Sequence, residues 1–418
     1  MSDLLLISFA RFLFIVGQLV YIKMFTNYLN AHELGVYYFL TTLSYSLNAL
    51  VFVPVDYFQQ AKIYKYIDNG TSLWGLLLFN GRLLLLVSIG LMIGLSFIIL
   101  IYPYEAINLL LVVMMSFALY TSQALRGLIN NLEHKRVAAI SIAFEAMVKI
   151  FIFWLLLQFM VPNAVTLLVS WIISCLLVIS FLGSQAHKLN VFAKFGKAAP
   201  KITFSEVFHF GYPISVGAIF NWFQLQGYRL VLVPLGLSTT VGIYATIANI
   251  GSAGMGGASS IFVQMFVPNI YKTFGQYTKI YLRNAVILVL FILMFSLVFA
   301  DIIVALVANT NFVKYSWVLF FGVIAEGGNF LIGALSIHIT ITASTKRMIV
   351  ASIIGVASMS IVFSGIYYWG YINVETVGIP IAVSQILTVA YLYFIFRRPI
   401  AKERLTTPKN EQDQQAPL

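Results

Sequence analysis

Charged side chains are scarce in this sequence. Asp, Glu, Lys and Arg make up 9% of its 418 residues, whereas hydrophobic residues make up 61%. A soluble domain carries about 25% charged residues, so this chain has too little polar surface to cover a water-soluble globule. Within a bilayer, backbone groups must be paired inside helices or closed barrels. Barrel strands alternate apolar and polar residues, but here the apolar runs are continuous. The sequence therefore predicts an all-α polytopic membrane protein.

Cysteine and clustered histidine are also lacking. Cys175 is the single cysteine, which excludes an intrachain disulfide and a thiolate metal cluster. The five histidines are scattered without the spacing of metal ligands. The glycine-rich stretch at 251–260 is not followed by the Gly-Lys-Ser/Thr of a phosphate-binding loop. We expect no metal site, no cofactor and no catalytic residue.

Long apolar segments are the main positive feature. A helix needs about 20 mostly apolar residues to cross the hydrocarbon core. Twelve segments meet this condition: 4–29, 34–58, 73–101, 107–126, 137–160, 164–185, 207–233, 241–270, 281–300, 315–343, 348–369 and 377–396. The first has no small-residue cleavage site, so we interpret it as a retained helix and not as a signal peptide.

Lysine and arginine are unevenly distributed over the loops. They gather after the even-numbered segments and in the C-terminal tail, whereas the loops after the odd-numbered segments contain only Lys314. Basic residues favour cytoplasmic loops, so both termini are predicted to be cytoplasmic. The net charge of +11 then reflects this bias and not a nucleic-acid partner.

Two short motifs recur half a chain apart. KRVAAISI at 135–142 is echoed by KRMIVASI at 346–353, and LGVY at 34–37 by VGIY at 241–244. Each pair opens equivalent predicted helices with nearly the same offset, which indicates two parallel six-helix repeats, as in some transporters. We expect bundles over 1–186 and 206–397, a cytoplasmic linker over 187–205, and a disordered cytoplasmic tail over 398–418.

Several charged residues fall inside the predicted helices, where each costs roughly 2.5–3.5 kcal/mol and normally faces a cavity. Most are basic. A cationic lumen between the halves would comprise Arg11, Gln18, Lys23, Arg82, Lys149, Asn221, Gln224, Tyr228 and Arg229. Asp56, Glu145 and Glu326 are candidates for coupling sites or counter-ions to the lumen.

Structural roles are the alternatives for these residues. Lys23 and Arg229 lie near the outer ends of their helices and could extend to the interface. Glu145 and Lys149 are four residues apart on one helical face and could neutralise each other. Arg11 and Arg82 lie at similar depth without an acidic neighbour in sequence, so they are the strongest candidates for a shared substrate site.

The stretch ARFLFIVGQLVYIKMFTNYLNAHELGVYYFLTTL at 10–43, together with Lys135-Arg136, resembles the Wzx polysaccharide flippases. These belong to the multidrug/oligosaccharidyl-lipid/polysaccharide (MOP) exporter superfamily. The resemblance implies a V-shaped bundle in a bacterial inner membrane. By alternating access it would move oligosaccharides on undecaprenyl diphosphate for O-antigen and lipopolysaccharide biosynthesis. A polysaccharide polymerase and a chain-length regulator would be further partners.

Two other classes of function stay open. A multidrug exporter of the same superfamily predicts a lumen dominated by acids, because typical drugs are cations, whereas here bases predominate. A membrane-embedded polymerase or glycosyltransferase needs a large outer loop or acidic residues near a membrane face, and the predicted outer loops are short. We therefore expect a flippase and not an enzyme.

Overall fold

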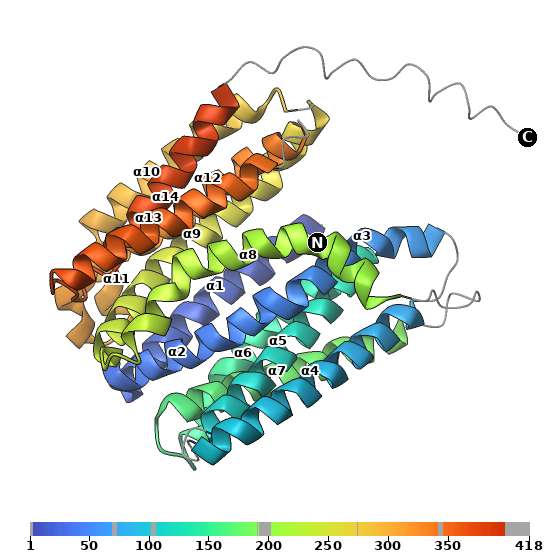
Figure 1. The fold of residues 1–418 in the computed structure, drawn as a ribbon, viewed down its shortest axis with the longest axis horizontal. Helices are drawn as coiled ribbons and strands as arrows, with labels where there is room; N and C mark the ends of the chain where they lie inside the picture. Colours follow the sequence, from blue (N-terminus) through green and yellow to red (C-terminus); the bar gives the residue numbers. More distant parts are fainter. Residues whose placement is uncertain are drawn as a thin grey trace, which may run out of the picture.

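The structure is a computed structural model that describes residues 3–68, 73–101, 106–189, 191, 202–273, 275–341 and 346–397. Within these ranges every regular element is a helix, and no strand occurs. The helices run side by side along one common direction (Figure 1). The predicted all-α fold is confirmed. The predicted linker lies partly, and the C-terminal tail entirely, outside the described residues.

The chain forms two bundles that differ in colour in Figure 1, the first blue to green and the second yellow-green to red. The first bundle contains α1 (Asp3–Tyr28), α2 (Ala31–Leu47), α3 (Val53–Asp68), α4 (Trp74–Ile101), α5 (Ala106–Asn131), α6 (Lys135–Leu156) and α7 (Ala164–Lys188). The second contains α8 (Phe204–Leu232), α9 (Ser238–Lys272), α10 (Thr278–Val298), α11 (Ala300–Val307), α12 (Leu319–Ile341), α13 (Lys346–Tyr368) and α14 (Gly378–Arg397).

Eleven helical segments among the described residues are long and apolar enough to cross a membrane. They match eleven of the twelve predicted segments. The twelfth is α8, which has 29 residues but is not among the eleven. Its sequence carries Gln224, Gln226 and Arg229 in its last third, and these lower its hydropathy. A helix that turns polar side chains toward a protein interior can span without being apolar throughout.

Two features depart from the predicted helices. The predicted loop between the ninth and tenth segments folds into the short helix α11 and a 3₁₀ segment, Thr310–Val318. Helices α2 and α3 form one span that is interrupted by a π-helical stretch, Asn48–Phe52. Pro54 follows this stretch directly. Because proline has no backbone N–H to donate, the helix widens there instead of continuing regularly.

The same helix neighbours recur in both bundles. In the first bundle α1 packs on α6, α2 on α5, α5 on α7, and α6 on α7. In the second, α8 packs on α13, α9 on α12, α12 on α14, and α13 on α14. The echoed Lys135 and Lys346 are the first residues of α6 and α13. The helix contacts thus repeat in the order that the two sequence echoes predict.

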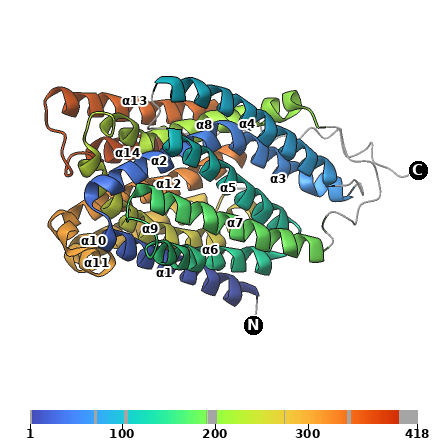
Figure 2. The same ribbon diagram turned by 90° about the horizontal axis from the view of Figure 1, so that it is seen from below.

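The start of α1 and the end of α14 lie at the same end of the molecule (Figure 1), which we call the near end. The turns that join α1 to α2 and α8 to α9 lie at the opposite, far end. Figure 2 shows α11 at the far end as well, beside α10. The two bundles meet mainly where α2 packs against α9 and α8, and where α3 packs against α8. Smaller contacts join α1 to α9 and α11.

Candidate functional site

A cavity of about 510 Å³ lies between the two bundles. Helices α1, α2, α6 and α7 form its wall on the first bundle, and α8, α9 and α12 form the wall on the second. We call it the central cavity. Five of the predicted site residues line it: Arg11, Gln18, Lys149, Arg229 and Glu326. The structure therefore brings together three bases and one acid that are far apart in the sequence.

Lys149 on α6 is enclosed by aromatic rings on the wall of the central cavity. Its ammonium nitrogen lies 3.5 Å from the centre of a Trp171 ring and 4.5 Å from the ring of Tyr21. Trp rings attract cations most strongly among the aromatic side chains. The Tyr21 hydroxyl is in turn 3.1 Å from Ser170 Oγ. These contacts fix a positive charge at the surface of the cavity without a directly bound acid.

Arg229 joins the second bundle to the first. Its Nε donates to the Tyr228 hydroxyl at 2.9 Å, and its Nη1 donates to Thr42 Oγ1 on α2 at 3.3 Å. The guanidinium also lies 5.1 Å from the centre of the Tyr38 ring. Only 7% of Arg229 is exposed. It is therefore held inside the protein, and does not extend to the membrane interface as one alternative required.

Arg11 on α1 connects the central cavity to a second one. This second cavity, of about 480 Å³, lies between α1, α5 and α6 and is also lined by Gln123, Arg126, Asn130 and Lys135. We call it the basic vestibule. Lys135 begins α6 at the near end, and Arg11 lies about 12 Å along α1 from its start. Three bases thus mark a route from the near end to the central cavity.

Glu145 does not pair with Lys149, although the spacing of the two residues on α6 suggested that it would. Glu145 instead accepts a hydrogen bond from Arg126 Nη2 at 2.6 Å, while Arg126 Nε donates to Ser141 Oγ at 2.9 Å. Glu326 of the second bundle lies in the central cavity and hydrogen-bonds to Asn329. Glu145 is thereby assigned to a structural ion pair, and Glu326 is the acid on the cavity wall.

At the far end the bundles close over the cavity. Gly35 and Gly242 let α2 and α9 touch through their backbones. Beside them, the Lys23 ammonium donates to the carbonyl oxygens of Ala305 and Ala308, at 2.8 and 2.6 Å. These carbonyls end α11, where the helix dipole favours a positive charge. Lys23 therefore acts as a tie between the bundles and does not line the cavity.

The other predicted site residues lie elsewhere. Arg82 is exposed on α4 and does not line the central cavity, so it does not share a site with Arg11. Asn221 is exposed, and Tyr228 serves as the acceptor for Arg229. Gln224 is buried inside the second bundle, where it donates to Ser384 Oγ at 2.7 Å. Asp56 accepts from Gln60 on its own helix at 2.7 Å.

Sequence reasoning missed several lining residues. Arg126 ends the predicted segment 107–126 and was not among the predicted site residues, although Gln123, Arg126 and Asn130 recur every three to four residues and therefore share one helical face. The aromatic wall of the central cavity was also missed, because aromatic residues are abundant throughout the chain. It consists of Phe14, Tyr21, Phe25, Tyr37, Tyr38, Tyr45 and Trp171.

No protein-family model and no curated protein matches the sequence. Solved structures do resemble the fold. Lipid II flippase MurJ, in an inward closed conformation, aligns with a TM-score of 0.69 at 12% identity over 95% of this chain and 87% of its own. An inward-facing multidrug resistance MATE family transporter of the MOP superfamily aligns with a TM-score of 0.65 at 12% identity, over 93% of this chain and 94% of its own.

A third similar structure is a MOP superfamily transporter from Pyrococcus furiosus, described as having a binding pocket of reverse polarity that suggests a different function. It aligns with a TM-score of 0.57 at 13% identity, over 94% of both chains. Coverage is nearly complete in all three comparisons, so the similarity concerns the whole fold and not one bundle. This chain is a multi-pass membrane protein with the fold of the MOP superfamily transporters and flippases.

Proposed function

We propose that the protein is a flippase that moves a lipid-linked oligosaccharide, carried on undecaprenyl diphosphate, from the cytoplasmic to the outer leaflet. The observation that carries this proposal is the basic route formed by Lys135, Arg126, Arg11, Lys149 and Arg229, of which Arg126 is paired with Glu145. A diphosphate head group is anionic, and arginine binds phosphate through a planar fork of donors. In a cavity of low dielectric constant, such charges concentrate an anion strongly.

The remaining lining suits the sugar part of the same substrate. Thr41, Gln226, Asn249, Ser252 and Ser260 supply hydroxyl and amide groups to the central cavity. Together with the aromatic wall they form a surface that is apolar in its body and polar at a few points, as is typical of small-molecule sites. Such a lining is able to accept the hydroxyl groups and ring faces of an oligosaccharide.

The closed far end and the vestibule at the near end suit the step in which the substrate enters the protein from the cytoplasmic leaflet. If the near end is cytoplasmic, as the loop charges predict, the vestibule opens toward the leaflet where lipid-linked sugars are assembled. An anion that leaves an inside-negative cell gains about 2.3 kcal/mol per charge and 100 mV. The membrane potential then favours export, and Glu326 serves as a counter-ion to the cationic cavity. The protein would reside in a bacterial inner membrane with both termini cytoplasmic.

Transport by purified protein in vesicles tests this proposal. A fluorescent polyprenyl-diphosphate oligosaccharide is added to proteoliposomes, and a membrane-impermeant quencher reports how much of it changes leaflet. We expect leaflet exchange with the wild type, a loss of at least fivefold with Lys149→Gln, and little change with the matched exposed control Lys314→Gln. A cationic dye is offered in parallel. Transport of the dye without exchange of the lipid would instead identify a drug exporter.

The cellular form of the experiment identifies the glycan. Deletion of the gene should cause one lipid-linked oligosaccharide to accumulate at the cytoplasmic face, while the synthesis of its sugar repeat continues. A polysaccharide polymerase and a chain-length regulator would then act on the exported product as separate proteins. Accumulation of no lipid-linked intermediate, with normal surface polysaccharide, would contradict the proposal.

A further inference from the structure

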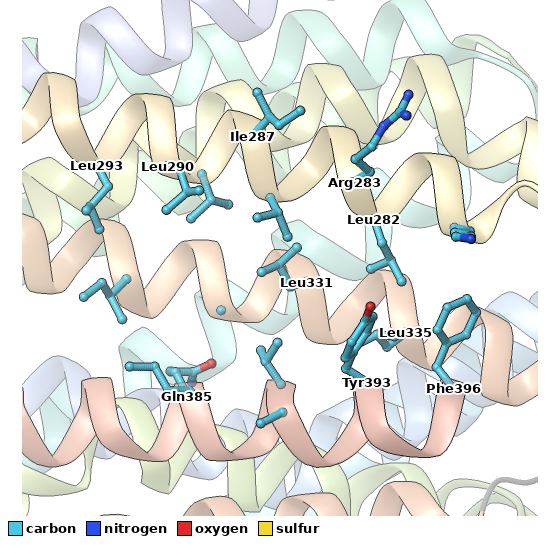
Figure 3. A pocket seen from close by; sticks show the side chains of 18 of the residues that line it. Leu282, Arg283, Ile287, Leu290, Leu293, Leu331, Leu335, Gln385, Tyr393 and Phe396 are labelled. Atoms are coloured by element: carbon cyan, nitrogen blue, oxygen red, sulfur yellow. The ribbon is translucent and has the colours of Figure 1, made fainter. Parts of the chain in front are cut away.

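A third cavity, of about 980 Å³, forms a groove along the outside of the second bundle. Figure 3 shows it between α10, α12 and α14, where Leu290, Leu293, Leu331 and Leu335 are among the side chains that line it. Its walls are almost entirely apolar over their length. From Arg283 to Leu293 the groove follows ten residues of α10, which corresponds to about 15 Å. These dimensions suit an extended hydrocarbon chain.

Positive charge gathers at one end of this groove. Lys279 and Arg283 are four residues apart on α10 and both line it, and Tyr393 and Phe396 line the same end from α14 (Figure 3). Arg397 lies beside them, because its Nε donates to the Tyr393 hydroxyl at 3.0 Å. This is the near end, where α10 begins and α14 ends. We call it the mouth of the groove.

The charge at the mouth is not balanced by the helices that form it. Neither α10 nor α14 contains an Asp or Glu, and the single acid of α12, Glu326, lines the central cavity instead. Basic pockets between membrane helices on the cytoplasmic side bind anionic lipid head groups. Tyrosine and phenylalanine at the same depth are typical of the membrane interface.

We propose that the groove is a binding site for an anionic glycerophospholipid of the cytoplasmic leaflet. Lys279 and Arg283 bind its phosphate, Arg397 adds to the positive field, and one acyl chain lies along the apolar walls toward Leu293. The site is separate from the transport route. It gives the second bundle a resident lipid between α10 and the α12–α14 pair.

Two other occupants fit the groove less well. The first is the tail of the transported lipid. Helix α12 separates the groove from the central cavity, because Glu326 lines the cavity while Gly328, two residues later, lines the groove. The tail would therefore have to cross α12. Residues two apart lie on nearly opposite faces of a helix. A second copy of this chain that used the groove symmetrically would bring the two basic mouths together, since a two-fold interface pairs the same patch with itself.

The groove has one polar residue at its deep end. Gln385 is 1% exposed, and neither atom of its amide has a hydrogen-bond partner among the described residues. A substitution of Gln385 therefore provides a control. The proposed lipid is selected by its charge at the mouth, so its binding should not depend on the Gln385 amide. A ligand recognised at the deep end would depend on Gln385 and not on Lys279 or Arg283.

Native mass spectrometry in a mild detergent tests the proposal with phosphatidylglycerol and phosphatidylcholine as probes. We expect preferential binding of phosphatidylglycerol to the wild type. Because each basic residue near a membrane surface contributes about fivefold, the Lys279→Gln/Arg283→Gln variant should bind it roughly thirtyfold more weakly. The charge-conserving Lys279→Arg/Arg283→Lys variant, the Gln385→Leu variant and the matched cytoplasmic control Lys346→Gln/Arg347→Gln should keep the preference.

Four results would overturn the proposal. One is equal binding of both lipids to the wild type. A second is an undiminished preference in the Lys279→Gln/Arg283→Gln variant. The third is loss of binding in Gln385→Leu alone, which would indicate a polar ligand at the deep end. Retention of a polyprenyl phosphate in place of phosphatidylglycerol would likewise assign the groove to the transported lipid.

Discussion

Gly35 on α2 and Gly242 on α9 face each other across the boundary between the two bundles. A side chain on Gly35 would meet the carbonyl oxygen of Ser238, and one on Gly242 would meet the carbonyl oxygen of Ala31. Each carbonyl belongs to the residue one helical turn before the opposite glycine. The contact is therefore reciprocal, as in an interface that pairs two equivalent surfaces.

The first prediction concerns this backbone contact. Valine in place of Gly242 should force α9 away from α2 at the far end and open the central cavity to the outside. A cysteine at Thr41, which lines that cavity, should then react faster with an impermeant maleimide added outside. Gly254→Val on the same helix is the matched control, because nothing lies within 4 Å of its added carbon. Equal rates in both variants would contradict the assigned closure.

The second prediction concerns Lys23. Lys23→Met keeps the length of the side chain but removes the bonds to the end of α11. A hydrogen bond to a charged group contributes about 1.5–3 kcal/mol, so the closed far end should lose roughly that much stability relative to an open one. The Thr41 cysteine again reports the change, with Lys314→Met as the control. No increase in labelling would mean that Lys23 does not hold this end closed.

The third prediction concerns the ion pair between Arg126 and Glu145. Both side chains are largely buried, so Glu145→Gln should leave a buried charge and lower stability by about 3 kcal/mol. A lower midpoint of thermal unfolding in detergent would show this. Arg126→Met combined with Glu145→Met should recover much of the loss, since a buried pair can often be replaced by apolar residues. A double variant as unstable as Glu145→Gln would argue against the pair as the cause.

The fourth prediction concerns orientation in the membrane. Val161 and Tyr371 are exposed at the far end, whereas His134 precedes α6 at the near end. Cysteines at Val161 and Tyr371 should react with an impermeant thiol reagent in intact spheroplasts, and one at His134 should react only after lysis. The native Cys175 is buried and should give little background. Labelling of His134→Cys alone in intact cells would invert the proposed topology.

The helices were largely predictable from the sequence because bilayer thickness imposes a minimum apolar length. The predicted ends of the third segment, 73–101, nearly coincide with α4 (Trp74–Ile101). The short helix α11 was missed because eight residues do not span a membrane. The repeated motifs at Lys135 and Gly35 predicted equivalent helix starts for a different reason. They lie where helices begin, and the position of Gly35 also needs a residue without a side chain.

The site was less predictable, because depth along a helix does not fix the direction of a side chain. Arg11 and Arg82 have similar depths, yet Arg11 lines the cavity and Arg82 is exposed on α4. Glu145 and Lys149 share a helical face, yet Glu145 binds Arg126 from the neighbouring helix α5. Such choices depend on which helices become neighbours, and periodicity within one segment does not contain that information.

The most direct test measures how glycan export depends on Arg11, the side chain that joins the vestibule to the central cavity. Surface polysaccharide is measured per molecule of membrane-inserted protein for Arg11→Ala, Arg11→Lys and Arg11→Glu, with exposed Arg82→Glu as the matched control. A charge-assisted hydrogen bond to phosphate contributes about 1.5–3 kcal/mol, so Ala should reduce export roughly tenfold to hundredfold. Lys should restore it only in part, Glu should be worse than Ala, and the control should resemble the wild type. Unchanged export per molecule in Arg11→Glu would contradict the claim that this basic route carries the substrate.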